Sequence, residues 1–363
     1  MNNQAGHFVQ QWRNLRSHAF DIEQNSTAGK TLMLSLWGRP ARVYTNANLS
    51  IVSGQECNAD CPFCVEKLRR TNEDGVFEKP TQAGEAIFLR ALDSALDELT
   101  PLNPSVSVTG GEPSLDPRLP EILSLLRRRN ARKITVTTNG SGLFERRQGA
   151  TMLDWITGAG ARHINISRAS VDDARNAALM RMPDGLDSAG LGEVIRLASA
   201  RGTRPRLSCA LMDGEVDNME GVLEYLQFAK RLGADNVIFR ELMKPDPATV
   251  SRYNPVAAFC EGARARLAPI LRQVSRNDDF RFIRQVMGYY YYVEVWGYGG
   301  MDVVFEGADL GLIDFMKRKT PGVIHEFVIR SDGRLGSSWH AREEPLGPPW
   351  LAGAMEPAAL RGA

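Results

Sequence analysis

The 363-residue sequence is poor in cysteine, in net charge and in long hydrophobic runs. Its five cysteines are too few and too clustered for a disulfide framework, which indicates a reducing compartment. The 44 Lys and Arg residues balance 43 Asp and Glu residues, so no overall field favours nucleic acid or a membrane surface as a partner. No stretch approaches the roughly 18 continuous apolar residues of a membrane span, and the N-terminus lacks the apolar core of a signal peptide. We therefore expect a cytoplasmic protein.

Short β-rich runs alternate with amphipathic helical runs between residues 46 and 245. This alternation predicts an α/β fold of repeated βα units around a parallel sheet. Residues 1–45 read as an N-terminal extension, and residues 246–363 as a C-terminal helix plus a β-rich segment that covers the core. The six predicted strands are Asn46–Val52, Ser105–Thr109, Ile134–Thr138, His163–Ser167, Arg206–Met212 and Asn236–Glu241.

Three cysteines follow the first predicted strand directly. Cys57, Cys61 and Cys64 have the spacing C-x3-C-x2-C. Three thiolates on one loop can bind three irons of a four-iron cluster and leave the fourth iron open. An open position is what a metal site needs to bind a second molecule. A structural zinc site is the alternative, but zinc takes four ligands and no nearby cysteine or histidine completes the set.

Glycine-rich or polar residues end the next three strands. In VSVTGGEP, residues 106–113, the paired glycines allow the backbone to approach a ligand closely, and Glu112 is placed to accept hydrogen bonds from a cationic amine. The third strand ends in Thr138 and Asn139, and the fourth in Ser167 and Arg168, which suit a carboxylate or ribose hydroxyls. Active sites of parallel α/β folds gather at the carboxyl ends of strands, so we expect one site at this rim.

Two of these motifs resemble a known family. The loop CNADCPFC, with Phe63 before its last cysteine, is similar to the signature of radical S-adenosylmethionine (SAM) enzymes, and GGEP is similar to that family's motif at the second strand. The resemblance covers residues 46–245. It is best to the MoaA-like branch, the relatives of the GTP cyclases of molybdopterin synthesis, on the segment RLSCALMDGEVDNMEGVLEYLQFAKRLGADNVIFREL.

The resemblance implies a partial (β/α)6 TIM-type barrel with a smaller C-terminal α+β extension. It implies a [4Fe–4S] cluster on the three loop cysteines, with SAM on the open iron and an electron donor such as flavodoxin or ferredoxin. One electron then cleaves SAM to a 5′-deoxyadenosyl radical, which abstracts hydrogen from the substrate. The implied cofactor-binding residues are Phe63, Gly110, Gly111, Glu112, Pro113, Thr138, Asn139, Ser167 and Arg168.

The fifth and sixth strands offer candidates for contact with the substrate. Matching RPRLSCALM to the family's strand places Arg206 and Ser208 inward, with Arg206 suited to an anionic or carbonyl group. Cys209 then points outward and is read as a packing residue, with a thiol hydrogen donor as the alternative. Arg240 and Glu241 end the sixth strand, and the sequence does not tell which of them faces the interior.

No cysteine follows Cys260. The resemblance therefore fails where the GTP cyclases and many peptide-modifying members bind further clusters, and one cluster is predicted. We expect a single-cluster radical SAM enzyme acting on a polar small molecule, such as a nucleoside, sugar or amino-acid derivative. Two alternatives stay open: radical modification of a peptide or protein, and a non-catalytic iron–sulfur protein.

Overall fold

Alternation of apolar and polar residues builds the strands of this protein. In HINIS, Ile164 and Ile166 are buried in the hydrophobic core, and the residues beside them face the other side of the sheet. The computed structural model describes residues 30–54, 56–70, 81–244, 250, 253–287, 291–308, 317–339 and 345–347. Within them the six predicted strands are present as β3 (Leu49–Val52), β4 (Val106–Thr109), β5 (Ile134–Thr138), β8 (His163–Ser167), β9 (Arg204–Leu211) and β10 (Asn236–Glu241).

The sheet continues beyond these six strands at both ends. β13 (Met301–Ala308) pairs in parallel with β10, and β15 (Phe327–Ile329) pairs in parallel with β3. Antiparallel strands β12 (Tyr291–Tyr298) and β11 (Phe280–Met287) follow at one end, and β16 (Leu335–Gly336) at the other. The order is β11-β12-β13-β10-β9-β8-β5-β4-β3-β15-β16. The predicted division at residue 245 stays a prediction, but the strands on both sides of it share one sheet.

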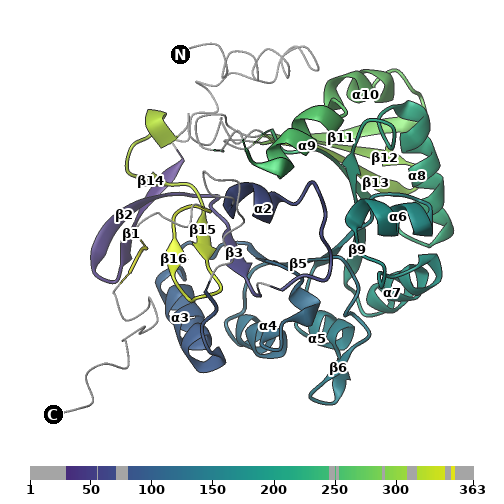
Figure 1. The fold of residues 1–363 in the computed structure, drawn as a ribbon. Helices are drawn as coiled ribbons and strands as arrows, with labels where there is room; N and C mark the ends of the chain where they lie inside the picture. The colour runs from purple at the N-terminus through teal and green to yellow at the C-terminus, as the bar shows by residue number, and fades with distance from the viewer. Residues whose placement is uncertain are drawn as a thin grey trace.

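Figure 1 shows the sheet as a curved wall with helices following one another around its outside. β11 and β16 are its two edges in the described chain, so the wall is an open, partial barrel, and the predicted fold class is confirmed. No helix in this part of the chain has both the length and the apolar character to cross a membrane. The outer helices are α3 (Glu85–Glu98), α4 (Leu119–Arg128), α5 (Met152–Gly158), α7 (Ser188–Ala200) and α8 (Met219–Arg231).

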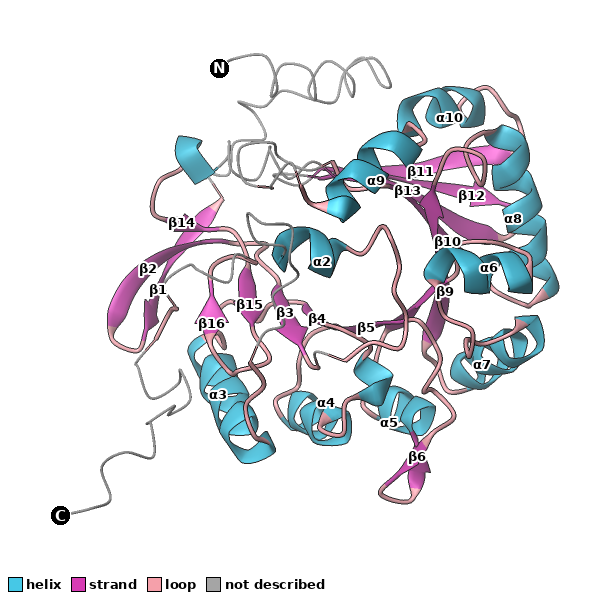
Figure 2. Cartoon of the chain, viewed as in Figure 1, coloured by secondary structure: helices cyan, strands magenta, loops and turns pink. Residues whose placement is uncertain are grey.

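Shorter elements complete the described chain. Figure 2 shows α2 (Val65–Arg70) on the inner side of the sheet, across from α3 and α4. Further helices are α6 (Asp173–Met180), α9 (Pro255–Ala263), α10 (Leu267–Val274) and the 3-10 turn η2 (Pro113–Leu115). A smaller sheet is made of β1 (Thr31–Leu36), β2 (Arg39–Tyr44) and β14 (Val323–Ile324), and β6 (Arg146–Arg147) pairs with β7 (Ala150–Thr151).

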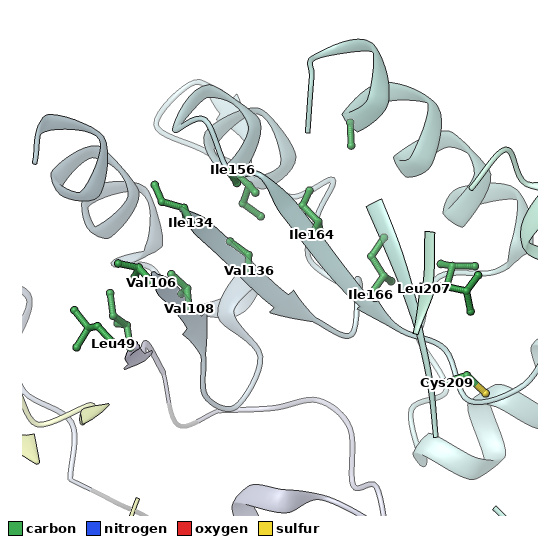
Figure 3. Close-up of a cluster of buried hydrophobic side chains, with 14 of the residues drawn as sticks. Leu49, Val106, Val108, Ile134, Val136, Ile156, Ile164, Ile166, Leu207 and Cys209 are labelled. Carbon is green, nitrogen blue, oxygen red and sulfur yellow. The ribbon is translucent and has the colours of Figure 1, made fainter. Parts of the chain in front are cut away.

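The main core lies between the sheet and its outer helices. Figure 3 shows aliphatic side chains such as Val136, Ile164 and Leu207 on this helix-facing side of consecutive strands. Each is fully buried. Because side chains alternate along a strand, the residues between them line the opposite, inner face of the sheet. Strands β5, β8 and β9 therefore place apolar residues on the outer face and polar residues on the inner face, whereas at β10 the inner face also carries a small apolar cluster of Ile238, Val295 and Val304.

A buried arginine joins three segments at the carboxyl edge of β3. The Arg118 guanidinium donates to the carbonyls of Ser53, Ala83 (3.0 Å) and Ser331 (3.3 Å), and forms an ion pair with Asp116 at 3.1 Å. Arg118 is 2% exposed and Asp116 4%. Ser53 comes directly before the cysteine loop, Ala83 before α3, and Ser331 after β15. One side chain thus fixes the start of the loop to the C-terminal part of the sheet.

We expect Arg118→Met to lower the free energy of unfolding by about 3–5 kcal/mol, because it leaves Asp116 buried without its cation. Urea denaturation followed by circular dichroism measures the loss. Arg128→Met is the matched control, since Arg128 is exposed on the neighbouring helix α4, and it should change stability by less than about 0.5 kcal/mol. Equal stability of the two variants would contradict this role of Arg118.

Candidate functional site

The three cysteines of the C-x3-C-x2-C motif lie on the loop between β3 and α2, at the carboxyl edge of the parallel sheet. Cys57 is exposed, whereas Cys61 and Cys64 are half-buried. The loop is tightly folded: the amide of Ala59 donates to Cys57 Sγ at 3.4 Å, and the amide of Cys64 donates to the Cys61 carbonyl at 3.2 Å. All three thiols therefore belong to one compact turn at the edge where the sequence predicted a site.

Contacts with helix α6 hold the middle of this loop. The amide of Asp60 donates to the Met180 carbonyl at 3.1 Å, and the Cys61 thiol donates to the same carbonyl at 3.5 Å. Arg181 forms an ion pair with the Asp60 carboxylate at 3.1 Å, and Lys67 forms another. Arg181 adopts a left-handed backbone with φ of 47°, which ends α6 at this contact. The loop is thereby fixed to the helix that follows β8.

Phe63 contacts a second apolar cluster beneath the loop. Its ring lies 6.3 Å from that of Phe259 in α9, in a cluster that also contains Met180 and Cys260. The sequence predicted a cofactor contact for Phe63, and that contact stays a prediction. What the structure shows is a packing contact that anchors the loop onto α9.

The surroundings of the three thiols disfavour uncompensated thiolates. Burial raises the pKa of Cys61 to about 12, and the neighbouring thiols of Cys64 and Cys57 raise it further. Burial also raises the pKa of Cys57 and Cys64. Thiolates at these positions therefore need a metal's positive charge to compensate them. This donor set, three soft sulfur ligands on one loop, fits an iron–sulfur cluster.

A single zinc ion fits this loop less well. Zinc–sulfur bonds of about 2.3 Å bring all the ligands of one zinc ion around a single point. Over the described residues, no group of three or more His, Cys, Asp or Glu side chains is arranged to hold one metal ion. In a cluster, by contrast, each thiolate binds a different iron, so three thiols need not converge.

The glycines of the GGEP segment bring the backbone of β4 against the loop. Gly110 has φ of +141°, and a Cβ atom there would lie 2.7 Å from the Gly54 carbonyl oxygen. The amide of Gly111 donates to that same carbonyl at 2.9 Å, and the amide of Glu112 donates to the Glu56 carbonyl at 2.7 Å. Glycine is therefore required at 110 because the cysteine loop passes there, a reason that the motif alone did not reveal.

Glu112 is a buried hub, 2% exposed, between the ends of β4 and β5. One carboxylate oxygen accepts from the Ser114 amide (3.0 Å), the Ser114 hydroxyl (2.6 Å) and the Thr138 hydroxyl, and the other accepts from the Asn139 amide (2.6 Å). Burial raises the pKa of Glu112, and these donors act against the rise. The predicted contact with an amine stays a prediction, since four protein donors already use this carboxylate.

Asn139 carries the network from Glu112 to the cysteines. Its side-chain amide donates to Asn58 Oδ1 at 2.9 Å and lies 3.9 Å from Cys57 Sγ, while its Oδ1 accepts from the Ser141 amide. The structure therefore brings together the predicted residues of three strand ends: the cysteine loop, the GGEP segment and the pair Thr138 and Asn139.

The predicted pair Ser167 and Arg168 separates into two environments. Ser167 ends β8, and its hydroxyl makes no hydrogen bond to the part of the chain that the structure describes. Arg168 is 2% exposed, and its three guanidinium nitrogens donate to the carbonyls of Ser170, Leu186 and Val171 and to Asp173. The predicted SAM contact of Arg168 stays a prediction, and the observed contacts hold the loops before α6 and before α7.

Strand register decides which substrate candidates face inward. In β9, half-buried Arg206 and Ser208 alternate with fully buried residues. Cys209 belongs to the helix-facing core, as predicted, and Figure 3 shows it there. Arg240 pairs with Ala210, and Glu241 with Leu211. Because paired residues of parallel strands share a face, Arg240 lies on the inner face and Glu241 on the helix-facing side.

Two inner-face residues were missed from the sequence. His163 and Asn165 on β8 are buried beside Arg206, which pairs with Asn165 across the strands. The signal was available: in HINIS the apolar residues occupy alternate positions, so the polar ones share the other face with Ser167.

We expect Glu112→Gln to destabilise the fold by about 1–3 kcal/mol, because the new amide group must face one of the buried donors instead of accepting from it. Guanidinium denaturation gives the free energy of unfolding. Glu145→Gln, at an exposed position, is the control and should stay within about 0.5 kcal/mol of the parent. A Glu112→Gln protein as stable as this control would show that the hub is dispensable.

Comparisons with known proteins agree with this geometry. A GTP 3′,8-cyclase of Mycolicibacterium smegmatis is 30% identical over 207 residues, which cover 55% of this chain and 50% of that protein. A probable GTP 3′,8-cyclase of Metallosphaera sedula is 29% identical over 212 residues, or 58% of each chain. The chain thus spans only about half to three-fifths of the length of these relatives.

Among solved structures, Streptococcus suis SuiB bound to precursor peptide SuiA superposes with a TM-score of 0.53 at 14% identity, over 86% of this chain and 67% of that one. SuiB bound to S-adenosylmethionine superposes with a TM-score of 0.50 at 13% identity, over 85% and 64%. These likenesses show the fold.

Residues 51–229 match the family model described as the radical SAM superfamily. That segment contains the cysteine loop, the GGEP segment and the strands β4 to β9. Enzymes of this family use a [4Fe–4S] cluster and S-adenosylmethionine. Residues 51–229, which join both motifs at the carboxyl edge of one partial barrel, are therefore a domain of the radical SAM superfamily.

Proposed function

We propose that Cys57, Cys61 and Cys64 each bind one iron of a [4Fe–4S] cluster. The observation that carries the proposal is a loop of three thiols held from both sides. Asn139 and Glu112 fix it from the β4–β5 side, and Asp60 fixes it to α6. When bound and reduced, the cluster supplies the electron that splits SAM into methionine and a 5′-deoxyadenosyl radical, which takes a hydrogen atom from the substrate.

We propose that SAM binds along the rim beside this loop. Ser167 supports this role, because its hydroxyl at the end of β8 has no partner in the described chain and is available to a ligand. Gly111, Pro113 and Thr138 lie at the ends of the neighbouring strands. For Glu112 and Arg168, whose polar atoms are largely engaged within the protein, we propose that they position the rim loops.

We propose a polar small molecule as the substrate, placed on the inner face of the sheet. Arg206, Ser208 and Arg240 line that face. The name of the curated relatives, GTP 3′,8-cyclase, supports a nucleoside-like compound. Modification of a peptide stays the alternative, and an electron donor such as flavodoxin or ferredoxin stays a prediction.

The test is SAM cleavage by the reconstituted protein. After anaerobic loading with iron and sulfide and reduction with dithionite, we expect 5′-deoxyadenosine from SAM, measured by liquid chromatography with mass detection. Cys61→Ala should lose both the cluster's electron paramagnetic resonance signal and the product, because one iron loses its protein ligand.

Cys209→Ala is the matched control, since Cys209 is buried in the helix-facing core and lies outside the loop. It should keep the iron content and the product of the parent. A parent protein with a full, reducible cluster that forms no 5′-deoxyadenosine, and whose resonance signal SAM leaves unchanged, would contradict the proposed function.

A further inference from the structure

Two buried polar atoms on the inner face of β8 have no hydrogen-bond partner within the described chain. They are Nδ1 of His163 and Oδ1 of Asn165, on side chains that are 7% and 5% exposed. The Asn165 amide nitrogen does have a partner, the Thr137 hydroxyl, at 3.3 Å. An unpaired buried polar atom keeps its full desolvation cost, so two of them on adjacent inward positions indicate a missing partner.

Half-buried cations surround these atoms. Arg206 lies beside Asn165 in strand register, and Lys133 precedes β5, whose Thr135 pairs with His163. The pKa values of His163 and Arg206 are lowered by this repulsion and by burial. Burial and the Arg206 and Lys133 charges lower the pKa of His163 to about 4, and burial together with Arg240 lowers the pKa of Arg206 to about 10. His163 is therefore neutral at pH 7, with one N–H to donate.

The cations near His163 and Asn165 differ in whether a carboxylate forms an ion pair with them. Nearby Arg204 is compensated by Asp235 at 3.0 Å and Asp302 at 2.6 Å, and Arg240 lies 3.6 Å from Glu306. Arg206 instead donates through Nε to a neutral amide, that of Asn236. In the described residues neither Arg206 nor Lys133 forms an ion pair with a carboxylate. The two unpaired atoms thus lie beside two cations without an ion-pair partner, although Glu306 and Asp302 offset part of the Arg206 charge from a distance.

We propose that His163, Asn165, Arg206 and Lys133 form the site for an anionic group of the substrate, a phosphate or a carboxylate. Arg206 presents a planar fork that matches either group, and Lys133 adds a second positive charge. The Asn165 oxygen accepts from a hydroxyl or N–H next to the anion. The substrate class is therefore an acidic, hydroxyl-bearing small molecule, such as a nucleotide. This inference rests on the proposed function, which it extends.

The position on the strand also orients the substrate. Strands rise about 3.3 Å per residue, so Asn165 and His163 lie about 7 and 13 Å below Ser167 at the rim. The anionic group then lies deep on the inner face, while the reacting carbon lies at the carboxyl edge beside the cysteine loop. A molecule with a ring between its anion and its reacting carbon spans this distance.

The test is anion binding by the cluster-loaded, full-length protein with SAM present and without reduction. Isothermal titration at constant ionic strength uses pyrophosphate as the phosphate probe and glucuronate as the carboxylate probe. We expect at least one to bind the parent, with Kd raised tenfold or more in Arg206→Gln. Arg196→Gln removes an equal charge from the outer helix α7 and should shift Kd less than twofold.

Asn165→Leu provides a second, independent readout. It removes an unpaired buried oxygen together with the 3.3 Å hydrogen bond to the Thr137 hydroxyl, so the two effects on stability offset each other and the free protein should stay close to the parent in stability, while the probe binds at least fivefold more weakly. A purely structural Asn165 would give the opposite result, a less stable protein with unchanged binding. This variant also decides the matter if Arg206→Gln does not fold.

Three outcomes overturn the inference: no binding of either probe to the parent, equal weakening by Arg206→Gln and Arg196→Gln, or unchanged binding in both Arg206→Gln and Asn165→Leu. The probe that binds distinguishes phosphate from carboxylate substrates. Because titration needs no SAM cleavage, a protein that binds the anion but forms no 5′-deoxyadenosine contradicts only the proposed function. A protein that cleaves SAM without binding either probe contradicts only the anion site.

Discussion

The site depends on the hydrogen bonds of Glu112. Its carboxylate accepts from donors in η2 and at the end of β5, and its backbone amide donates to the cysteine loop. Without it, three segments that are distant in sequence would have no common anchor. Burial makes such a carboxylate costly unless every oxygen is satisfied, so the network is nearly all-or-none. Glu112, which the family motif assigns to ligand binding, holds the segments of the rim together in this fold.

The features that depend on local sequence pattern could be predicted from the sequence. Short β-rich runs such as HINIS, set between helical runs, predicted the inner strands, and the cysteine spacing with GGEP predicted which strand ends meet. Parallel strands have their carboxyl ends at one edge, so placing the strands also placed the motifs. The direction of Cys209 followed from the match of RPRLSCALM to the family's strand, and the structure has this residue in the core.

The rest depended on contacts between distant residues. β13 and β15 are short or ambiguous in sequence, and only pairing with β10 and β3 places them in the sheet. Arg168 looked like a ligand-binding cation, but the carbonyls that it contacts come from loops whose path the sequence does not reveal. The choice between Arg240 and Glu241 needed a register, and His163 became informative only once its neighbours across the strands were known.

The placement of β15 has a consequence for biosynthesis. The strand β3 forms early in the chain, yet one of its two neighbours, β15, is made only after residue 326, and Arg118 must then reach Ser331. Until that point β3 is an open edge, and open edges pair with other chains. Folding of this protein is therefore completed late and over long sequence separation, which slows it and exposes it to aggregation during synthesis.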